Sequence, residues 1–237
     1  MLKNRLFNAT GDTLAGTHNH ASGHTNIISG VLRGSWGVEP VYGSSEFSPN
    51  NFPVSYNVKR GDGGVGASPS VASTHVTREY QICLKCHSDY AYGATPPALG
   101  NTGGGTLPGT NGVDDYTNQA IEFQAPGGHK GQVSTTDSGA ASAYSNNNHR
   151  SWHPVIDNTG RTQGIRTTNP ANWEAPWGAT ADVGSQTMYC SDCHGSNTAN
   201  ATSAPSGGEN GNPWGPHGSS NNFILKGPWN QSTGTGT

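Results

Sequence analysis

Two short motifs contain every cysteine of the chain. Residues 83–87 read Cys-Leu-Lys-Cys-His, residues 190–194 read Cys-Ser-Asp-Cys-His, and the chain has four cysteines in total. The pattern C-x-x-C-H is typical of c-type haem attachment, in which two thiols bond to one porphyrin and the adjoining histidine is held beneath the iron. We therefore predict two haem c groups. The residues expected to attach them and to provide the proximal iron ligands are Cys83, Cys86, His87, Cys190, Cys193 and His194.

Three other uses of paired cysteines fit the spacing less well. A zinc ribbon places its two C-x-x-C pairs about 15–20 residues apart, whereas about a hundred residues separate Cys86 from Cys190. A thioredoxin-like redox site has one C-x-x-C near a βαβ pattern, which this sequence lacks. Disulfides within each pair would leave the two following histidines without a role. Haem attachment accounts for all six motif residues.

The composition is poor in the side chains that normally build a core. Leu, Ile, Val and Phe make up about one residue in seven of the 237, which is below the level of a self-sufficient core. The chain also has 35 glycines and 15 prolines, so it would tend towards disorder unless something else filled its interior. Two large apolar porphyrins would do so. We predict a mostly irregular, coil-rich fold with a few short helices and short β-strands, organised around haem.

Charge and hydropathy argue against several partners. The net charge is −3 and no basic run exists, so nucleic-acid binding has no support. No stretch approaches the roughly 20 apolar residues of a membrane helix, and we expect no membrane span. Residues 1–7 lack the apolar run of a signal peptide. Because c-type haem is normally attached after export, we expect an extracellular, cell-surface or periplasmic protein whose numbering starts near a mature N-terminus or inside a longer precursor.

Few segments have the residue pattern of a helix or a strand, so the elements that position the motifs must be short. Residues 76–89 lack helix breakers and lead into the first motif, which predicts a helix there. Residues 113–124 predict a second short helix. Residues 27–32 and 52–58 are β-like runs interrupted by glycine and proline. Residues 36–40 predict an ordered turn with an aromatic anchor.

The second axial ligand of each iron decides the chemistry. Methionine would raise the reduction potential, whereas a second histidine gives a lower one. The chain has only Met1 and Met188, and Met188 is too close to Cys190 to reach the far face of that haem. Because eight further histidines are present, we predict bis-histidine ligation of both irons. A six-coordinate iron has no vacant position for a substrate, which favours electron transfer over an enzyme.

The histidines outside the motifs fall in three parts of one predicted dihaem domain. These parts are an N-terminal arm (1–30), a first haem lobe (31–189) and a second haem lobe (190–237). The arm histidines are either solvated side chains or ligands for a haem of the same or a neighbouring subunit. The candidate distal ligands are His18, His20, His24, His149, His153 and His217.

Several segments resemble the large multihaem c-type cytochromes of metal-reducing bacteria. The resemblance is carried by residues 79–88, 151–155, 190–196 and 215–219, and residues 36–40 are similar to a segment found upstream in those proteins. It covers scattered motifs and not a continuous stretch. Family members usually carry more haems than the two expected here.

The resemblance implies ligand roles and an assembly. His153 would complete the first haem, with His149 as its main rival, and His217 would complete the second. Some relatives polymerise into extracellular filaments, in which haems form a continuous chain and a subunit can lend a histidine to its neighbour. The resemblance therefore implies a homopolymer that exchanges electrons with redox proteins or extracellular acceptors, with the N-terminal arm as a source of ligands between subunits.

Two alternatives use the same motifs. A monomeric periplasmic or cell-surface carrier would need the same ligands but no polymer contacts. A dihaem peroxidase or reductase would need an open or labile axial position on one iron.

Overall fold

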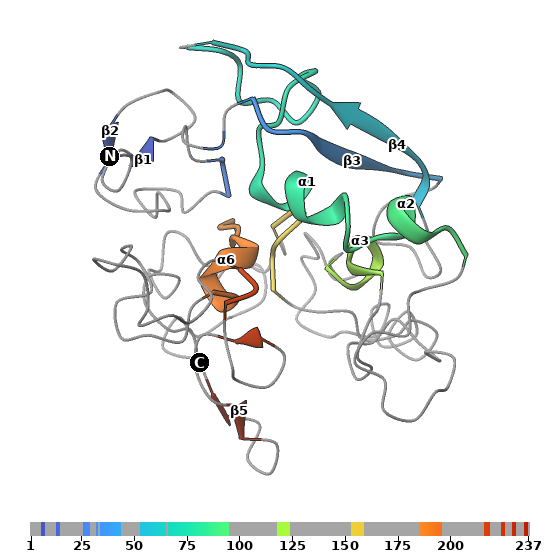
Figure 1. Cartoon of the computed structure of the whole chain (residues 1–237), viewed down its shortest axis with the longest axis vertical. Coiled ribbons are helices and arrows are strands. Elements are labelled where there is room, and N and C mark those ends of the chain that lie inside the picture. Colours follow the sequence, from blue (N-terminus) through green and yellow to red (C-terminus); the bar gives the residue numbers. More distant parts are fainter. Residues whose placement is uncertain are drawn as a thin grey trace, which may run out of the picture.

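The computed structural model describes separate segments of the 237-residue chain. They are residues 6–7, 13–14, 26–28, 32, 34–43, 53–64, 66–94, 118–123, 153–158, 185–195, 216–218, 224–225, 229–230 and 235–236. Within them the regular elements are short helices and two-stranded antiparallel sheets (Figure 1). Four candidate ligands lie outside the described residues, namely His18, His20, His24 and His149.

The longest strands form an antiparallel pair. β3 (Gly37–Tyr42) pairs with β4 (Pro53–Lys59), and a β-bulge interrupts the register near the end of β3. The strand predicted at residues 52–58 corresponds to β4. The turn predicted at residues 36–40 is wrong, because Gly37 and the residues after it are extended and pair with β4.

The single helix predicted at residues 76–89 is two short helices. They are α1 (Glu79–Leu84), which runs into the first motif, and α2 (Asp89–Tyr92). Ser88 separates them: its hydroxyl donates to the carbonyl of Leu84 at 2.5 Å and accepts a backbone N–H of α2 at 3.3 Å. A serine in this position caps a new helix instead of continuing the previous one.

The start of α1 depends on Gln81, which is completely buried. Its side-chain oxygen accepts the backbone N–H groups of Thr77 and Arg78 at 2.8 and 3.1 Å, and its side-chain nitrogen donates to Glu39 at 2.6 Å. β3 packs directly on this turn. A Cβ atom at Gly37 would lie 2.8 Å from the backbone carbonyl of Gln81, so the close approach of β3 to α1 requires a glycine.

A small apolar cluster lies beside the two motifs. Its buried members are Val38, Tyr80, Leu84, Ala120, Val155 and Met188. Ala120 comes from α3 (Gln119–Glu122), whose Gln119 N–H donates to the carbonyl of His87 at 2.9 Å. The helix predicted at residues 113–124 is this single turn within the part that the structure describes. Segments far apart in the chain therefore share one core.

A short segment around Ile27 connects three of these distant segments. Ile27 forms an antiparallel bridge with Arg78, just before α1. The backbone N–H of Asn26 donates to Oγ1 of Thr187 at 2.8 Å, and the side-chain amide of Asn26 donates to the carbonyl of Val155. The β-like run predicted here thus forms a single described bridge, and its backbone ties the approach to each motif together.

The remaining described elements are short. α6 (Cys190–Cys193) is the helical turn of the second motif. Two small hairpins pair β1 (Leu6–Phe7) with β2 (Thr13–Leu14) and β5 (Trp229–Asn230) with β6 (Thr235–Gly236). No helix in the described segments has the length and apolar character needed to cross a membrane.

The buried carboxylate of Glu39 should make the stability of the chain depend on pH. Tyr80 and Gln81 donate hydrogen bonds to it, but burial is the largest influence and raises the pKa of Glu39 above its ordinary value of 4.5. The folded chain therefore binds this proton more tightly than the unfolded chain. The free energy of unfolding should fall as the pH rises from about 4.5 through the folded pKa.

Glu39→Gln is expected to lose this fall, because glutamine does not titrate. Urea unfolding of the purified chain, at pH values below and above that window, measures the effect. Asp62→Asn is the matched control, since Asp62 is exposed on the loop after β4. Identical pH profiles for Glu39→Gln and the wild type would contradict the prediction.

Candidate cofactor-attachment site

Each C-x-x-C-H motif forms one helical turn with the same internal hydrogen bond. In the first, the N–H of His87 donates to the carbonyl of Cys83 at 2.9 Å. In the second, the N–H of His194 donates to the carbonyl of Cys190 at 3.0 Å. Each motif thus places its histidine one helical turn after its first cysteine. This is the donor set that covalent haem attachment requires, and the residues fit that group.

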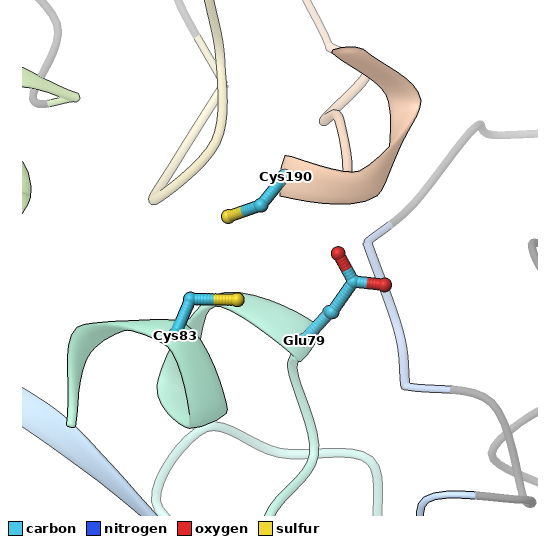
Figure 2. A group of neighbouring side chains, drawn as sticks. All are labelled: Glu79, Cys83 and Cys190. Atoms are coloured by element: carbon cyan, nitrogen blue, oxygen red, sulfur yellow. The ribbon is translucent and has the colours of Figure 1, made fainter. Parts of the chain in front are cut away.

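The two motifs lie against each other. One ligand atom from each of Glu79, Cys83 and Cys190 falls within 4.8 Å of the others. Figure 2 shows Glu79 and Cys83 on α1, with their side chains directed towards the Cys190 sulfur on α6. A hydrogen bond with Cys83, followed by burial, raises the pKa of the Cys190 thiol well above its ordinary value.

Glu79 joins the two motifs through Ser191. One carboxylate oxygen accepts the backbone N–H of Ser191 at 2.9 Å, and the other accepts the Ser191 hydroxyl at 2.6 Å. Glu79 itself is only 9% exposed. A buried carboxylate must be hydrogen-bonded to offset its lost hydration, and Ser191 provides both partners.

Glu79, Cys83 and Cys190 together could also be considered as a site for a metal ion. One feature argues against this use: both oxygens of Glu79 already accept hydrogen bonds from Ser191.

Four described histidines lie close together at the motifs: His87, His153, His194 and His217. The ring centroids of His87 and His217 are 5.8 Å apart, with the ring planes inclined by 33°. Burial, and then the proximity of His217 and His194, lowers the pKa of His87. His153 keeps solvent access, yet desolvation by neighbouring protein atoms, and then His194, lowers its pKa. Both shifts favour the neutral imidazole, which is the form that binds metals.

The ring of His194 is oriented by the chain after the second motif. Its Nδ1 lies 3.3 Å from the carbonyl oxygen of Ile224. A carbonyl oxygen can only accept, so a hydrogen bond here places the proton on Nδ1 and leaves the lone pair on Nε2. Metal-binding histidines are commonly oriented by such a contact. Leu225 adds a backbone bridge to His194.

The position of one candidate distal ligand differs from what the resemblance implies. The resemblance pairs His153 with the first motif and His217 with the second. In the structure His217 lies beside His87 of the first motif. His194 is close enough to both His153 and His87 to lower the pKa of each.

Sequence reasoning did not identify Glu79 or Ser191 as site residues. Ser191 lies inside the second motif, and Glu79 precedes Cys83 by one helical turn, so both residues lie in or next to a predicted attachment motif. Their contact joins residues 112 positions apart, which no local pattern reveals.

No protein-family model, curated protein or solved structure matches the chain. Function must therefore be inferred from the chemistry of the residues themselves.

Met188 is expected to be a core residue and not an iron ligand. It is 7% exposed, it belongs to the apolar cluster, and its N–H donates to the carbonyl of Pro154 at 2.9 Å. Met188→Leu should leave the visible absorption spectrum of the purified chain unchanged. Met188→Ala should keep the spectrum too, but lower the free energy of unfolding by about 2–5 kcal/mol because it leaves a cavity. If the spectrum of Met188→Leu changes as expected for the loss of an iron ligand, this assignment is wrong.

Proposed function

We propose that the chain is an electron-transfer protein that carries two covalently attached haem c groups. One observation carries the proposal. Both C-x-x-C-H motifs form the same helical turn, and together they use all four cysteines. Cys83 and Cys86 would hold the first haem, and Cys190 and Cys193 the second. When bound, haem supplies an iron that gains and loses one electron.

His87 and His217 would bind the first iron, and His194 and His153 the second. Two imidazoles that bind one metal ion at about 2 Å from each nitrogen have ring centroids about 6 Å apart, and the rings of His87 and His217 are 5.8 Å apart. The second pair takes the remaining described histidine near the motifs, since His194 lowers the pKa of His153 as it does that of His87.

The protein's own residues would tune and protect these sites. Burial lowers the pKa of His87, which favours its neutral form, and the carbonyl of Ile224 orients the ring of His194. Bis-histidine ligation leaves no vacant position for a substrate and lowers the potential relative to histidine–methionine ligation. These properties suit a carrier of electrons, and the alternative of a dihaem peroxidase or reductase requires one ligand to be absent or labile.

Haem content and ligand substitution test this proposal together. The chain, produced with a c-type haem maturation system, should contain two haems by the pyridine haemochrome assay, and Cys83→Ala/Cys86→Ala should contain one. To assign ligands, Cys190→Ala/Cys193→Ala serves as a background that retains only the first haem. In that background His217→Ala should convert the iron from low to high spin in the EPR spectrum, whereas His153→Ala should not.

His75→Ala is the matched control, because His75 is a half-buried histidine that lies against the loop at Gly63. Its spectrum should equal that of the one-haem background. A chain with stoichiometric zinc and no haem would overturn the proposal in favour of a metal centre at Glu79, Cys83 and Cys190. High-spin iron in the unsubstituted chain would favour the enzyme.

We further propose that the chain is exported and forms an extracellular homopolymer that conducts electrons over long distances. Support comes from the resemblance to filament-forming cytochromes and from the surplus histidines His18, His20 and His24. In the polymer one of these arm histidines would replace His153 or His217 as a ligand to a haem of the neighbouring subunit. Two haems make only a short path within one subunit, and a polymer would extend it. The alternative is a monomeric carrier.

Electron microscopy of the concentrated, haem-loaded chain distinguishes these assemblies. Filaments are expected for the wild type. A triple variant, His18→Ala/His20→Ala/His24→Ala, should assemble poorly while keeping two haems. Monomers alone at high concentration would contradict the polymer and favour the carrier.

A further inference from the structure

The side chain of Glu79 ties the helix of the first motif to the second motif. Its two oxygens accept the N–H and the hydroxyl of Ser191, at 2.9 and 2.6 Å. Ser191 immediately follows Cys190, so the link acts next to the first cysteine of the second motif. A carboxylate that accepts two hydrogen bonds from one residue restricts both the distance and the orientation of that residue.

Glu79 is itself held firmly on the side of the first motif. Its N–H donates to the carbonyl of Asn26 at 3.3 Å, and it begins α1, whose start is tied down by Gln81. Glu79 and Cys83 are four residues apart on this helix, and therefore share a face. Figure 2 shows both side chains directed towards Cys190. The carboxylate thus lies next to both first cysteines, with the ligand atoms within 4.8 Å of one another.

We propose that Glu79 is a positioning residue that sets the spacing of the two haems and places a negative charge between their attachment edges. This inference rests on the proposed function. Cys83 and Cys190 would each carry one thioether of a different haem, so the contact between the two sulfurs brings two attachment edges together at Glu79. A nearby negative charge in a partly buried site favours the more positive, oxidised iron, and so lowers both reduction potentials.

The two roles of Glu79 can be separated by substitution. Glu79→Gln removes the charge but keeps an oxygen that can accept the Ser191 N–H. Glu79→Ala removes the charge and both hydrogen bonds. Ser191→Ala removes one hydrogen bond and leaves the charge and the backbone bond in place. Asp62→Asn is the control for loss of a carboxylate on an exposed loop away from the motif residues.

Two measurements on the haem-loaded chain test the inference. Spectroelectrochemical titration gives the reduction potentials, and the split Soret signal in circular dichroism reports the coupling between the haems. Glu79→Gln should raise both potentials and keep the split signal. Glu79→Ala should raise both potentials and lose much of the splitting, whereas Ser191→Ala should weaken the splitting with little change in potential. Asp62→Asn should match the wild type.

Haem content is measured first, so that the two proposals fail separately. An unsubstituted chain without haem overturns the proposed function. The role of Glu79 is overturned, and the proposed function is not, if the wild type and Glu79→Gln both contain two haems but neither Glu79→Gln nor Glu79→Ala differs from the wild type in reduction potentials or Soret splitting. Lower stability of Glu79→Ala with unchanged potentials would likewise overturn it, because a purely structural contact predicts that result. If Glu79→Ala does not fold, the role of Glu79 is tested by the reduction potentials of Glu79→Gln and by the Soret splitting of Ser191→Ala.

Discussion

A carboxylate on α1 holds the residue that follows the first cysteine of α6, and the rest of the described structure depends on this junction. Glu79 can do so because its own helix is anchored twice, by Gln81 to β3 and by the bridge between Ile27 and Arg78. The same short segment at Ile27 also accepts the hydroxyl of Tyr189 at 2.6 Å, just before the second motif. Two motifs far apart in the chain are therefore fixed relative to each other by polar contacts.

Polar contacts have this importance because the apolar core is small. The described cluster draws single residues such as Val38, Ala120 and Val155 from separate segments, and no helix of the described part exceeds two turns. Buried polar groups such as Glu39 and Gln81 supply specificity that a larger apolar core would otherwise provide. A buried polar network specifies one arrangement only when its members are satisfied, and Gln81 satisfies both ends of its amide. A haem-binding chain could then rely on its porphyrins for the remaining apolar burial.

The chemistry proposed for the chain follows from what lies on the far side of each motif. A histidine opposite a proximal histidine closes the iron to substrates, whereas an open position would permit catalysis. Met188 packs in the apolar cluster, and so the described residues that remain for this role are histidines. His217 lies near His87 and His153 near His194, which is the arrangement that the proposed closed, electron-carrying site needs.

By itself, the sequence determined the candidate chemistry, because covalent attachment needs cysteines and a histidine at a fixed local spacing, which can be read directly at residues 83–87 and 190–194. It also indicated β4, where a β-like run is bounded by turn residues. It misplaced the helix at 76–89, because the capping hydroxyl of Ser88 competes with helix continuation. Only the tertiary structure decided which histidine lies near which motif and that Glu79 meets Ser191. The contacts of His217 with His87 and of Glu79 with Ser191 join segments more than a hundred residues apart. They depend on how the chain folds back on itself, which local spacing does not encode.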